Sequence, residues 1–183
     1  SGQMSGDYRE HRRLQQQKTG PMKISEAFTF CGSDKNTVHH YGPFYDGLVE
    51  TLRPRTVLEV GVHKGASLRA WRHVGYPVEA IGIDRQRVEG VAMVVATAPD
   101  FAPVLSELEG RKFDLIIDDG SHVLLHQLEA VNQLQQLLEP GGYFVVEDLQ
   151  GQAAIDAFRM RGWSFFDRRD SGRYDDIIAF QQF

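Results

Sequence analysis

The stretch Val57-Leu58-Glu59-Val60-Gly61-Val62-His63-Lys64-Gly65 decides the expected fold of this 183-residue chain. It opens with a short apolar run, Val57–Gly61, of the kind that becomes a buried strand, and a glycine ends that run. A helical pattern over Ala66–Val74 follows at once. A buried strand that leads through a glycine turn into a helix is typical of a mainly parallel α/β sheet.

The alternation of strands and helices continues to the end of the chain. No helical pattern separates the last two apolar runs, so we expect them to form an antiparallel hairpin at one edge, with a turn around Ser171-Gly172. Pro140-Gly141-Gly142 is expected to stop the preceding helix. The pattern predicts a doubly wound, Rossmann-like sheet of about seven strands. Its further strands are Val78–Asp84, Val91–Thr97, Phe113–Asp119, Tyr143–Val146, Trp163–Arg168 and Asp176–Gln181, and its further helices are His126–Leu138 and Ala153–Met160.

Composition narrows the class of protein. A net charge of −5 gives no basic footprint for nucleic acid, and no apolar run approaches the roughly 20 residues that span a bilayer. The single cysteine, Cys31, allows no intramolecular disulfide, which fits a reducing, cytoplasmic setting. We expect a tag remnant, Ser1-Gly2-Gln3, and a polar arm in residues 1–21, a helical N-terminal cap in residues 22–52, and one catalytic domain in residues 53–183.

The turn after the first strand is a candidate cofactor site, because ligands of such sheets bind at the carboxyl ends of the strands. Gly61 allows a close approach of ligand to backbone, and Asp84 ends the second strand about 20 residues later, where a carboxylate can accept ribose hydroxyls. His63 stands where a dinucleotide fingerprint has its second glycine, and Glu59 suits a cationic ligand. These features favour S-adenosylmethionine over NAD, and a purely structural turn is the alternative.

Acidic residues follow two further strands. Asp118-Asp119 ends one strand and Glu147-Asp148 the next. If these strands are neighbours, their ends lie about 4.8 Å apart, and so many carboxylates need a compensating cation. A hard divalent ion such as magnesium fits, with Asp119, Glu147 and Asp148 as ligands, while strand alternation turns Asp118 to the other face, where it braces the turn. The alternative is that these acids cap the following helix.

His122 lies three residues after Asp119 at the rim of this acidic group. A neutral imidazole there can take the proton of an alcohol, whose pKa a nearby metal ion lowers. The alternative is a structural histidine, and His126 is a weaker candidate for the same role.

Taken together, these residues resemble the metal-dependent class I methyltransferases that modify sugar hydroxyls of macrolide antibiotics, the mycinamicin and tylosin type. The resemblance covers about residues 32 to 150. Its most specific parts are the Asp-Gly-Ser-His run and the Glu-Asp pair. The matching pieces are Gly32-Ser33-Asp34-Lys35 with His40-Tyr41 and Tyr45, Leu58–Val62 with Gly65 and Ser67, Ile117–His122, Leu138–Gly142, and Val146–Leu149.

The resemblance implies site roles. It implies magnesium at Asp119, Glu147 and Asp148, His122 as general base, and an upstream element, Gly32–Tyr45, that closes over cofactor and acceptor. The expected cofactor-binding residues are Glu59, Gly61, Gly65, Ser67, Asp84 and Asp118, with Lys35 and Tyr41 from the upstream element. The third strand departs from the family, since Ala96-Thr97-Ala98 stands where relatives often have Gly-Asp-Gln, and this affects the adenine contacts.

The expected function is O-methylation of a hydroxyl on a sugar, a glycosylated natural product or a polysaccharide. The alternatives are a catechol-type small-molecule methyltransferase, an inactive module that binds S-adenosylmethionine, and an NAD oxidoreductase. Few residues separate Leu149 from the sixth strand, which leaves little room for an acceptor-binding lid. We therefore expect a small acceptor, or a pocket that the N-terminal arm or a second copy of the chain completes.

Overall fold

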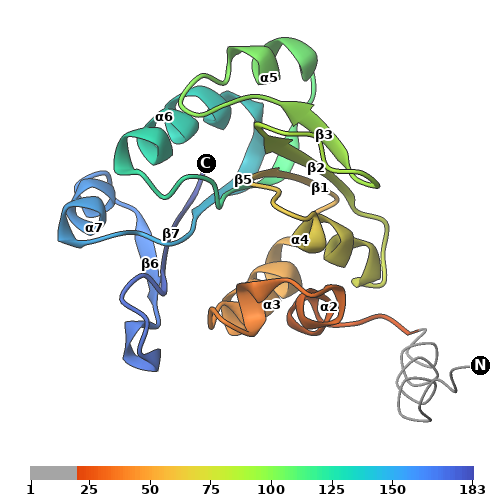
Figure 1. The fold of residues 1–183 in the computed structure, drawn as a ribbon, viewed down its shortest axis with the longest axis horizontal. Helices are drawn as coiled ribbons and strands as arrows, with labels where there is room; N and C mark the ends of the chain where they lie inside the picture. Colours follow the sequence, from red (N-terminus) through yellow and green to blue (C-terminus); the bar gives the residue numbers. More distant parts are fainter. Residues whose placement is uncertain (1–19) are drawn as a thin grey trace, which may run out of the picture.

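The computed structural model describes residues 20–183 and shows a seven-stranded sheet with helices on both faces (Figure 1). The strand order is β3-β2-β1-β4-β5-β7-β6. The strands are β1 (Thr56–Val60), β2 (Glu79–Asp84), β3 (Ala92–Val95), β4 (Phe113–Asp118), β5 (Leu138–Val146), β6 (Ser164–Asp167) and β7 (Ile177–Gln182). The first five strands are parallel, and β7 is antiparallel to both of its neighbours. The predicted doubly wound sheet with its C-terminal hairpin is confirmed.

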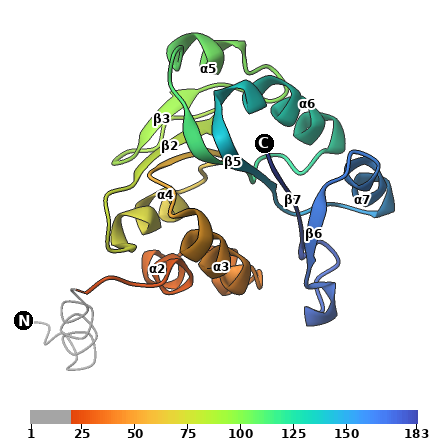
Figure 2. The same cartoon turned by 180° about the vertical axis from the view of Figure 1, so that it is seen from behind.

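The helices divide between the two faces of the sheet, as the two opposite views show (Figures 1 and 2). One apolar cluster joins the sheet to α5 (Ala102–Glu107), α6 (Leu124–Leu134) and α7 (Gln152–Arg159). The other joins it to α2 (Ile24–Cys31), α3 (Gly42–Leu52) and α4 (Ala66–Ala70). Both clusters contain residues of β4 and β5, because side chains alternate between the faces of each strand.

Two details of the expected secondary structure were wrong. The short helix α5 was not predicted, since Ala102–Glu107 is too brief to show a helical period. Helix α6 ends at Leu134 and is followed by a 3-10 turn, Gln135–Leu137, so that Pro140-Gly141-Gly142 lies inside β5. The pairing of β4 with β5 shifts register between Phe113 and Leu115, and this irregularity accommodates a proline and the left-handed Gly141, φ 86°.

The structure describes the expected N-terminal cap but almost none of the segment before it. The tag remnant and nearly all of the polar arm lie outside the described residues. The segment 22–52 contains α2, the 3-10 turn Asp34–Asn36 and α3, and its apolar side chains share a cluster with the sheet. Cys31 is a half-buried free thiol whose pKa burial raises. Over residues 20–183, none of the helices has the length and apolar character needed to cross a bilayer.

Candidate functional site

The turn that follows β1 is held by backbone contacts and by one carboxylate. Gly61 has φ 89°, and a Cβ atom on it would lie 2.0 Å from the carbonyl oxygen of Asp119. The amides of Val62 and His63 donate to Asp84 Oδ2 at 2.8 and 3.2 Å. The structure therefore places Asp84 beside the turn as predicted from its position, with one oxygen engaged by the turn itself.

Two buried polar side chains at this turn lack hydrogen bonds. Neither carboxylate oxygen of Glu59 has a hydrogen-bond partner among residues 20–183, and the same holds for Ser67 Oγ in α4. Burial raises the pKa of Glu59, and the ammonium of Lys35, 3.2 Å from Oε1, opposes that rise. Lys35 compensates the charge of Glu59, and the oxygens of Glu59 and Ser67 that remain without a hydrogen bond can accept from a ligand that carries donors.

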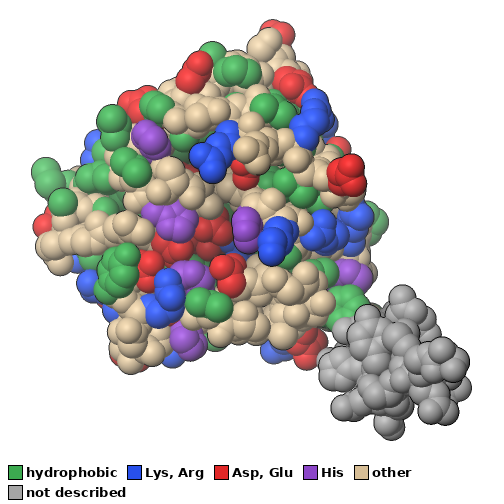
Figure 3. Space-filling view, in the orientation of Figure 1, with side chains coloured by type: hydrophobic (Ala, Val, Ile, Leu, Met, Phe, Trp, Pro, Cys, Tyr) green, Lys and Arg blue, Asp and Glu red, His purple; other side chains and the backbone are tan. Residues whose placement is uncertain are grey.

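The acids that follow β4 and β5 lie side by side. The amide of Glu147 donates to the carbonyl of Asp118 at 2.9 Å, and Asp118 pairs with Val146 in the sheet. This pairing brings Asp119, Glu147 and Asp148 to one small region. Figure 3 shows a patch of acidic side chains there, with histidines around it.

A lysine ammonium lies among these carboxylates. Lys35 Nζ is 2.5 Å from Asp119 Oδ2, 2.8 Å from Glu147 Oε1 and 3.2 Å from Glu59 Oε1. Burial by itself would lower the pKa of Lys35, but the surrounding carboxylates raise it well above its usual value. Lys35 is therefore a buried permanent cation that joins the turn after β1 to the acidic end of the site.

The same surroundings shift the acids in different directions. Burial disfavours ionised Asp119, yet the charges and hydrogen bonds of Lys35 and His122 lower its pKa to about 2. Burial raises the pKa values of Glu147 and Asp148, and the charge of neighbouring Asp119 adds to both. A further cation at this end would stabilise the ionised forms of Glu147 and Asp148.

His122 bridges the two acidic strand ends. Its Nε2 lies 3.3 Å from Asp119 Oδ1 and its Nδ1 lies 3.4 Å from Asp148 Oδ2. The hydrogen bond to Asp119 raises the pKa of His122, against the effect of burial. His122 and Asp148 both have left-handed backbones, φ 59° and 55°, a conformation that costs energy in a residue other than glycine and often occurs at functional sites.

The residues whose potential ligand atoms lie closest together differ in one member from the predicted set of metal ligands. Asp119, His122 and Asp148 each offer one ligand atom, and these atoms lie within 4.8 Å of one another. The third predicted ligand, Glu147, is fully buried nearby, and its Oε1 accepts hydrogen bonds from Lys35 and Tyr45. Which of these four residues bind an ion therefore stays a prediction.

Two tyrosines from the start of α3 hold the Glu-Asp pair. The hydroxyl of Tyr41 donates to Asp148 Oδ1, and to the carbonyl of Asp175 at 3.1 Å. The hydroxyl of Tyr45, one helical turn later, donates to Glu147 Oε1. Burial and the adjacent carboxylates raise the pKa of both phenols, which keeps them neutral donors. Lys35 and Tyr41, predicted as cofactor contacts, thus lie against acids, and their role toward a cofactor stays a prediction.

The other predicted cofactor residues brace turns. Asp118 Oδ1 accepts from the amide of Gly120 at 3.1 Å, and burial raises the pKa of this carboxyl to about 7. Gly65, φ 75°, begins α4 in a left-handed conformation. His126, the weaker base candidate, has its Nδ1 2.8 Å from Ser121 Oγ.

Sequence reasoning gave no individual role to four residues at the acidic end: His39, Tyr45, Gln127 and Asp176, although the first two lie in the predicted upstream element Gly32–Tyr45. Gln127 Nε2 donates to the carbonyl of Glu147 at 3.0 Å, and Asp176 contacts His39. One signal was available for Asp176. Because the last strand was expected to be antiparallel, its beginning had to lie at the same sheet edge as the carboxyl ends of the parallel strands.

Comparisons with known proteins find relatives by sequence and by fold. No family model matches the chain. It is 38% identical over 135 residues, 65% of this chain and 35% of the relative, to 8-demethyl-8-alpha-L-rhamnosyl tetracenomycin-C 2'-O-methyltransferase of Streptomyces olivaceus. It is 32% identical to demethylmacrocin O-methyltransferase of Streptomyces fradiae, over 62% of this chain and 32% of that relative.

A solved structure shares the fold. The MycE methyltransferase of the mycinamycin biosynthetic pathway, in complex with Mg, SAH and mycinamycin VI, superposes with a TM-score of 0.69 at 23% identity. The match covers 88% of this chain and 55% of that one. The chain is therefore similar in sequence to these O-methyltransferases over about two thirds of its own length, and it shares the fold of the solved structure. It spans about a third of the length of the two curated relatives it matches.

Proposed function

We propose that the chain provides the cofactor and metal sites of an S-adenosylmethionine-dependent, magnesium-assisted O-methyltransferase that acts on a hydroxyl of a sugar, a glycosylated natural product or a polysaccharide. The observation that carries this proposal is the compact group of Asp119, His122 and Asp148, joined through Lys35 to the buried Glu59 beside Ser67. A base, a candidate cation site and a candidate donor site thus occupy neighbouring strand ends.

The cofactor end fits a cationic donor molecule. Glu59 and Ser67 offer buried acceptors to an ammonium or sulfonium group at the turn after β1. A pyrophosphate would meet the Glu59 carboxylate instead, which disfavours NAD. S-adenosylmethionine, when bound here, would supply the methyl group that the acceptor oxygen takes.

The acidic end fits a hard divalent cation. Carboxylate oxygens are the ligands that magnesium prefers, and the raised pKa values of Glu147 and Asp148 indicate two acids that a cation would stabilise. Asp119 and Asp148 would hold the ion, with Glu147 or His122 beside them. The ion would orient an acceptor hydroxyl and lower its pKa.

His122 is the proposed general base. Its two carboxylate neighbours fix the ring and raise its pKa, which makes the neutral imidazole a stronger proton acceptor and also keeps it protonated to a higher pH. We therefore propose that the rate of methyl transfer rises with pH as His122 loses its proton. The half-buried position of its ring leaves it within reach of an acceptor.

The names of the relatives support the proposed class of acceptor, and the contacts of residues 22–52 support the proposed domain boundaries. Relatives named for rhamnosyl, olivosyl and macrolide substrates favour a saccharide hydroxyl over a catechol. We propose residues 22–52 as a cap that reaches the acids through Lys35 and Tyr41, and residues 53–183 as the methyltransferase domain. A cytoplasmic location and the absence of nucleic-acid and membrane partners stay predictions, as does assembly into a homo-oligomer.

Asp119→Ala tests the proposal. It should abolish magnesium-dependent methyl transfer, measured with labelled S-adenosylmethionine on a panel of rhamnosides, macrolide glycosides and catechols. Cofactor affinity by calorimetry should change only a few-fold. Asp156→Ala, an exposed acid of α7, is the control and should behave as the unaltered chain. Transfer that survives both Asp119→Ala and a chelator would remove the ion from the mechanism. Cofactor binding without turnover on any acceptor would favour an inactive module.

A further inference from the structure

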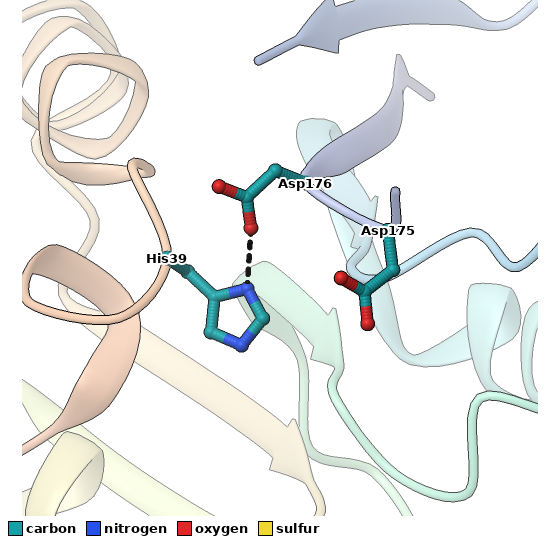
Figure 4. A group of neighbouring side chains, drawn as sticks. All are labelled: His39, Asp175 and Asp176. Atoms are coloured by element: carbon teal, nitrogen blue, oxygen red, sulfur yellow. Dashed lines mark hydrogen bonds and ion pairs between the residues drawn. The ribbon is translucent and has the colours of Figure 1, made fainter. Parts of the chain in front are cut away.

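Asp176 lies directly before β7 and is fully buried, although it takes no part in the reaction as proposed. Its Oδ1 lies 2.7 Å from Nδ1 of His39, and its Oδ2 lies 2.9 Å from Nδ1 of His40 (Figure 4 shows the contact with His39). Ser171 Oγ also donates to Oδ2, at 2.9 Å, and Arg173 Nε lies 3.4 Å from Oδ1. One carboxylate thus joins two adjacent histidines that precede it by more than a hundred residues in the chain.

The segment that carries these histidines, Ser33–Tyr41, is here called the strap. Three of its amides donate to a single carbonyl, that of Asp34, and the amide of Tyr41 donates to the carbonyl of Lys35. These bonds shape the strap but do not fix it to the sheet. Side-chain contacts with residues far away in the sequence fix the strap to the sheet. One of them is the contact of Asp176 with His39 and His40, the two residues that precede Tyr41.

His39 reaches from Asp176 to the acidic end of the site. Its Nδ1, 2.7 Å from Asp176, is also 3.4 Å from Asp148 Oδ1, and its ring stacks on Tyr41 with 5.2 Å between centroids. Tyr41 in turn donates to the same oxygen of Asp148. Because Nδ1 carries only one proton, the closer carboxylate of Asp176 takes that hydrogen bond and fixes the ring.

We propose that Asp176 is a positioning residue for Asp148, and that it acts through His39 and Tyr41. The inference rests on the proposed function, because Asp148 is a proposed ligand of the divalent ion. Residues that hydrogen-bond a metal ligand orient it, and their loss typically weakens metal binding by about 10- to 100-fold; Asp176 acts one contact further out, so we expect a smaller effect. Asp148 requires such support because its backbone is left-handed and strained.

The neighbouring acid Asp175 provides a matched control. It is also buried and one residue away, but its side chain pairs with Arg173 and not with the strap. Asp175→Asn therefore removes the same charge from the same place without removing the contact to His39. Asp176→Asn keeps the shape of the side chain and one acceptor oxygen, so it should be milder than Asp176→Ala.

Binding of Mn²⁺ and of S-adenosylmethionine to these variants, each measured by calorimetry, tests the proposal. Asp176→Ala and His39→Ala should each weaken Mn²⁺ binding at least fivefold and change cofactor affinity less than twofold, with Asp176→Asn between them and the unaltered chain. The double variant Asp176→Asn with His39→Ala should be no weaker than His39→Ala by itself. Unchanged or tighter Mn²⁺ binding in the single variants, or an equal loss in Asp175→Asn, would overturn the proposal.

Amide hydrogen exchange of the strap gives a readout that needs neither ion nor turnover. The amides of residues 39–41 should exchange faster in Asp176→Asn and His39→Ala than in the unaltered chain, and at the same rate in Asp175→Asn. Equal protection in all four would refute the anchoring role. If the unaltered chain binds no Mn²⁺, the metal part of the proposed function fails, whereas the exchange result still decides whether Asp176 fixes the strap.

Discussion

The two ends of the site are built in different ways. The cofactor end comes from one βαβ unit, in which Glu59, Gly61, Ser67 and Asp84 lie within a short stretch of chain. The acidic end combines the ends of β4 and β5, the strap and the start of β7, with contacts that join residues as far apart as His39 and Asp176. The first end depends on local backbone geometry, and the second on long-range pairing of charges.

The largest expected effect is at the cofactor end and concerns its backbone. Gly61→Ala would place a methyl group 2.0 Å from the carbonyl of Asp119 in a left-handed conformation, so we expect a loss of about 3 kcal/mol or more in the free energy of unfolding. Urea unfolding measures this. Gly47→Ala, in the open middle of α3, should instead raise stability by up to about 1 kcal/mol. Equal effects of the two substitutions would contradict the local account of this end.

At the acidic end, His122→Ala should change chemistry and leave the turn after β1 intact. We expect turnover to fall by about 100- to 10,000-fold, with cofactor affinity nearly unchanged, because a general base acts only in the transition state. Initial rates and calorimetry separate the two quantities. His126→Ala tests the weaker base candidate, whose ring hydrogen-bonds Ser121, and should change turnover far less than His122→Ala. Unchanged turnover in His122→Ala would move the base elsewhere, to His39, His40 or His126.

A third prediction concerns Asp118, which lies between the two ends and affects stability only through pH. Burial raises its pKa from 3.8 to about 7, so the folded chain holds a proton that the unfolded chain releases at lower pH. The free energy of unfolding should therefore fall as pH rises from about 4 to about 7, by roughly 1–4 kcal/mol. Asp118→Asn keeps an acceptor for the amide of Gly120 and should flatten this slope. Urea unfolding with chelator present, at several pH values, measures it, and an unchanged slope would assign the pH dependence to another group.

The residues that sequence reasoning found and missed follow the same division. Glu59, Gly61 and Asp84 could be placed from one strand-turn-helix pattern, because their separation in the chain fixes their separation in space. The ends of β4 and β5 could be placed because parallel neighbours end at the same edge of a sheet. No such rule placed Lys35, Tyr45 and His39, and Lys35 was named only through the family resemblance, because loop and helix-start residues of these types are common and their partners lie far along the chain.

The sequence by itself determined the sheet, its hairpin and the strand ends where polar residues gather, because hydrophobic period and turn chemistry act over a few residues. Only the tertiary structure decided which charges meet: that Lys35 lies between Asp119 and Glu147, that two tyrosines hold the Glu-Asp pair, and that Asp176 anchors the strap. The physical reason is that a buried charge is stabilised by whichever residues the packed chain brings next to it. These residues lie far away along the chain, so a local stretch of sequence does not identify them.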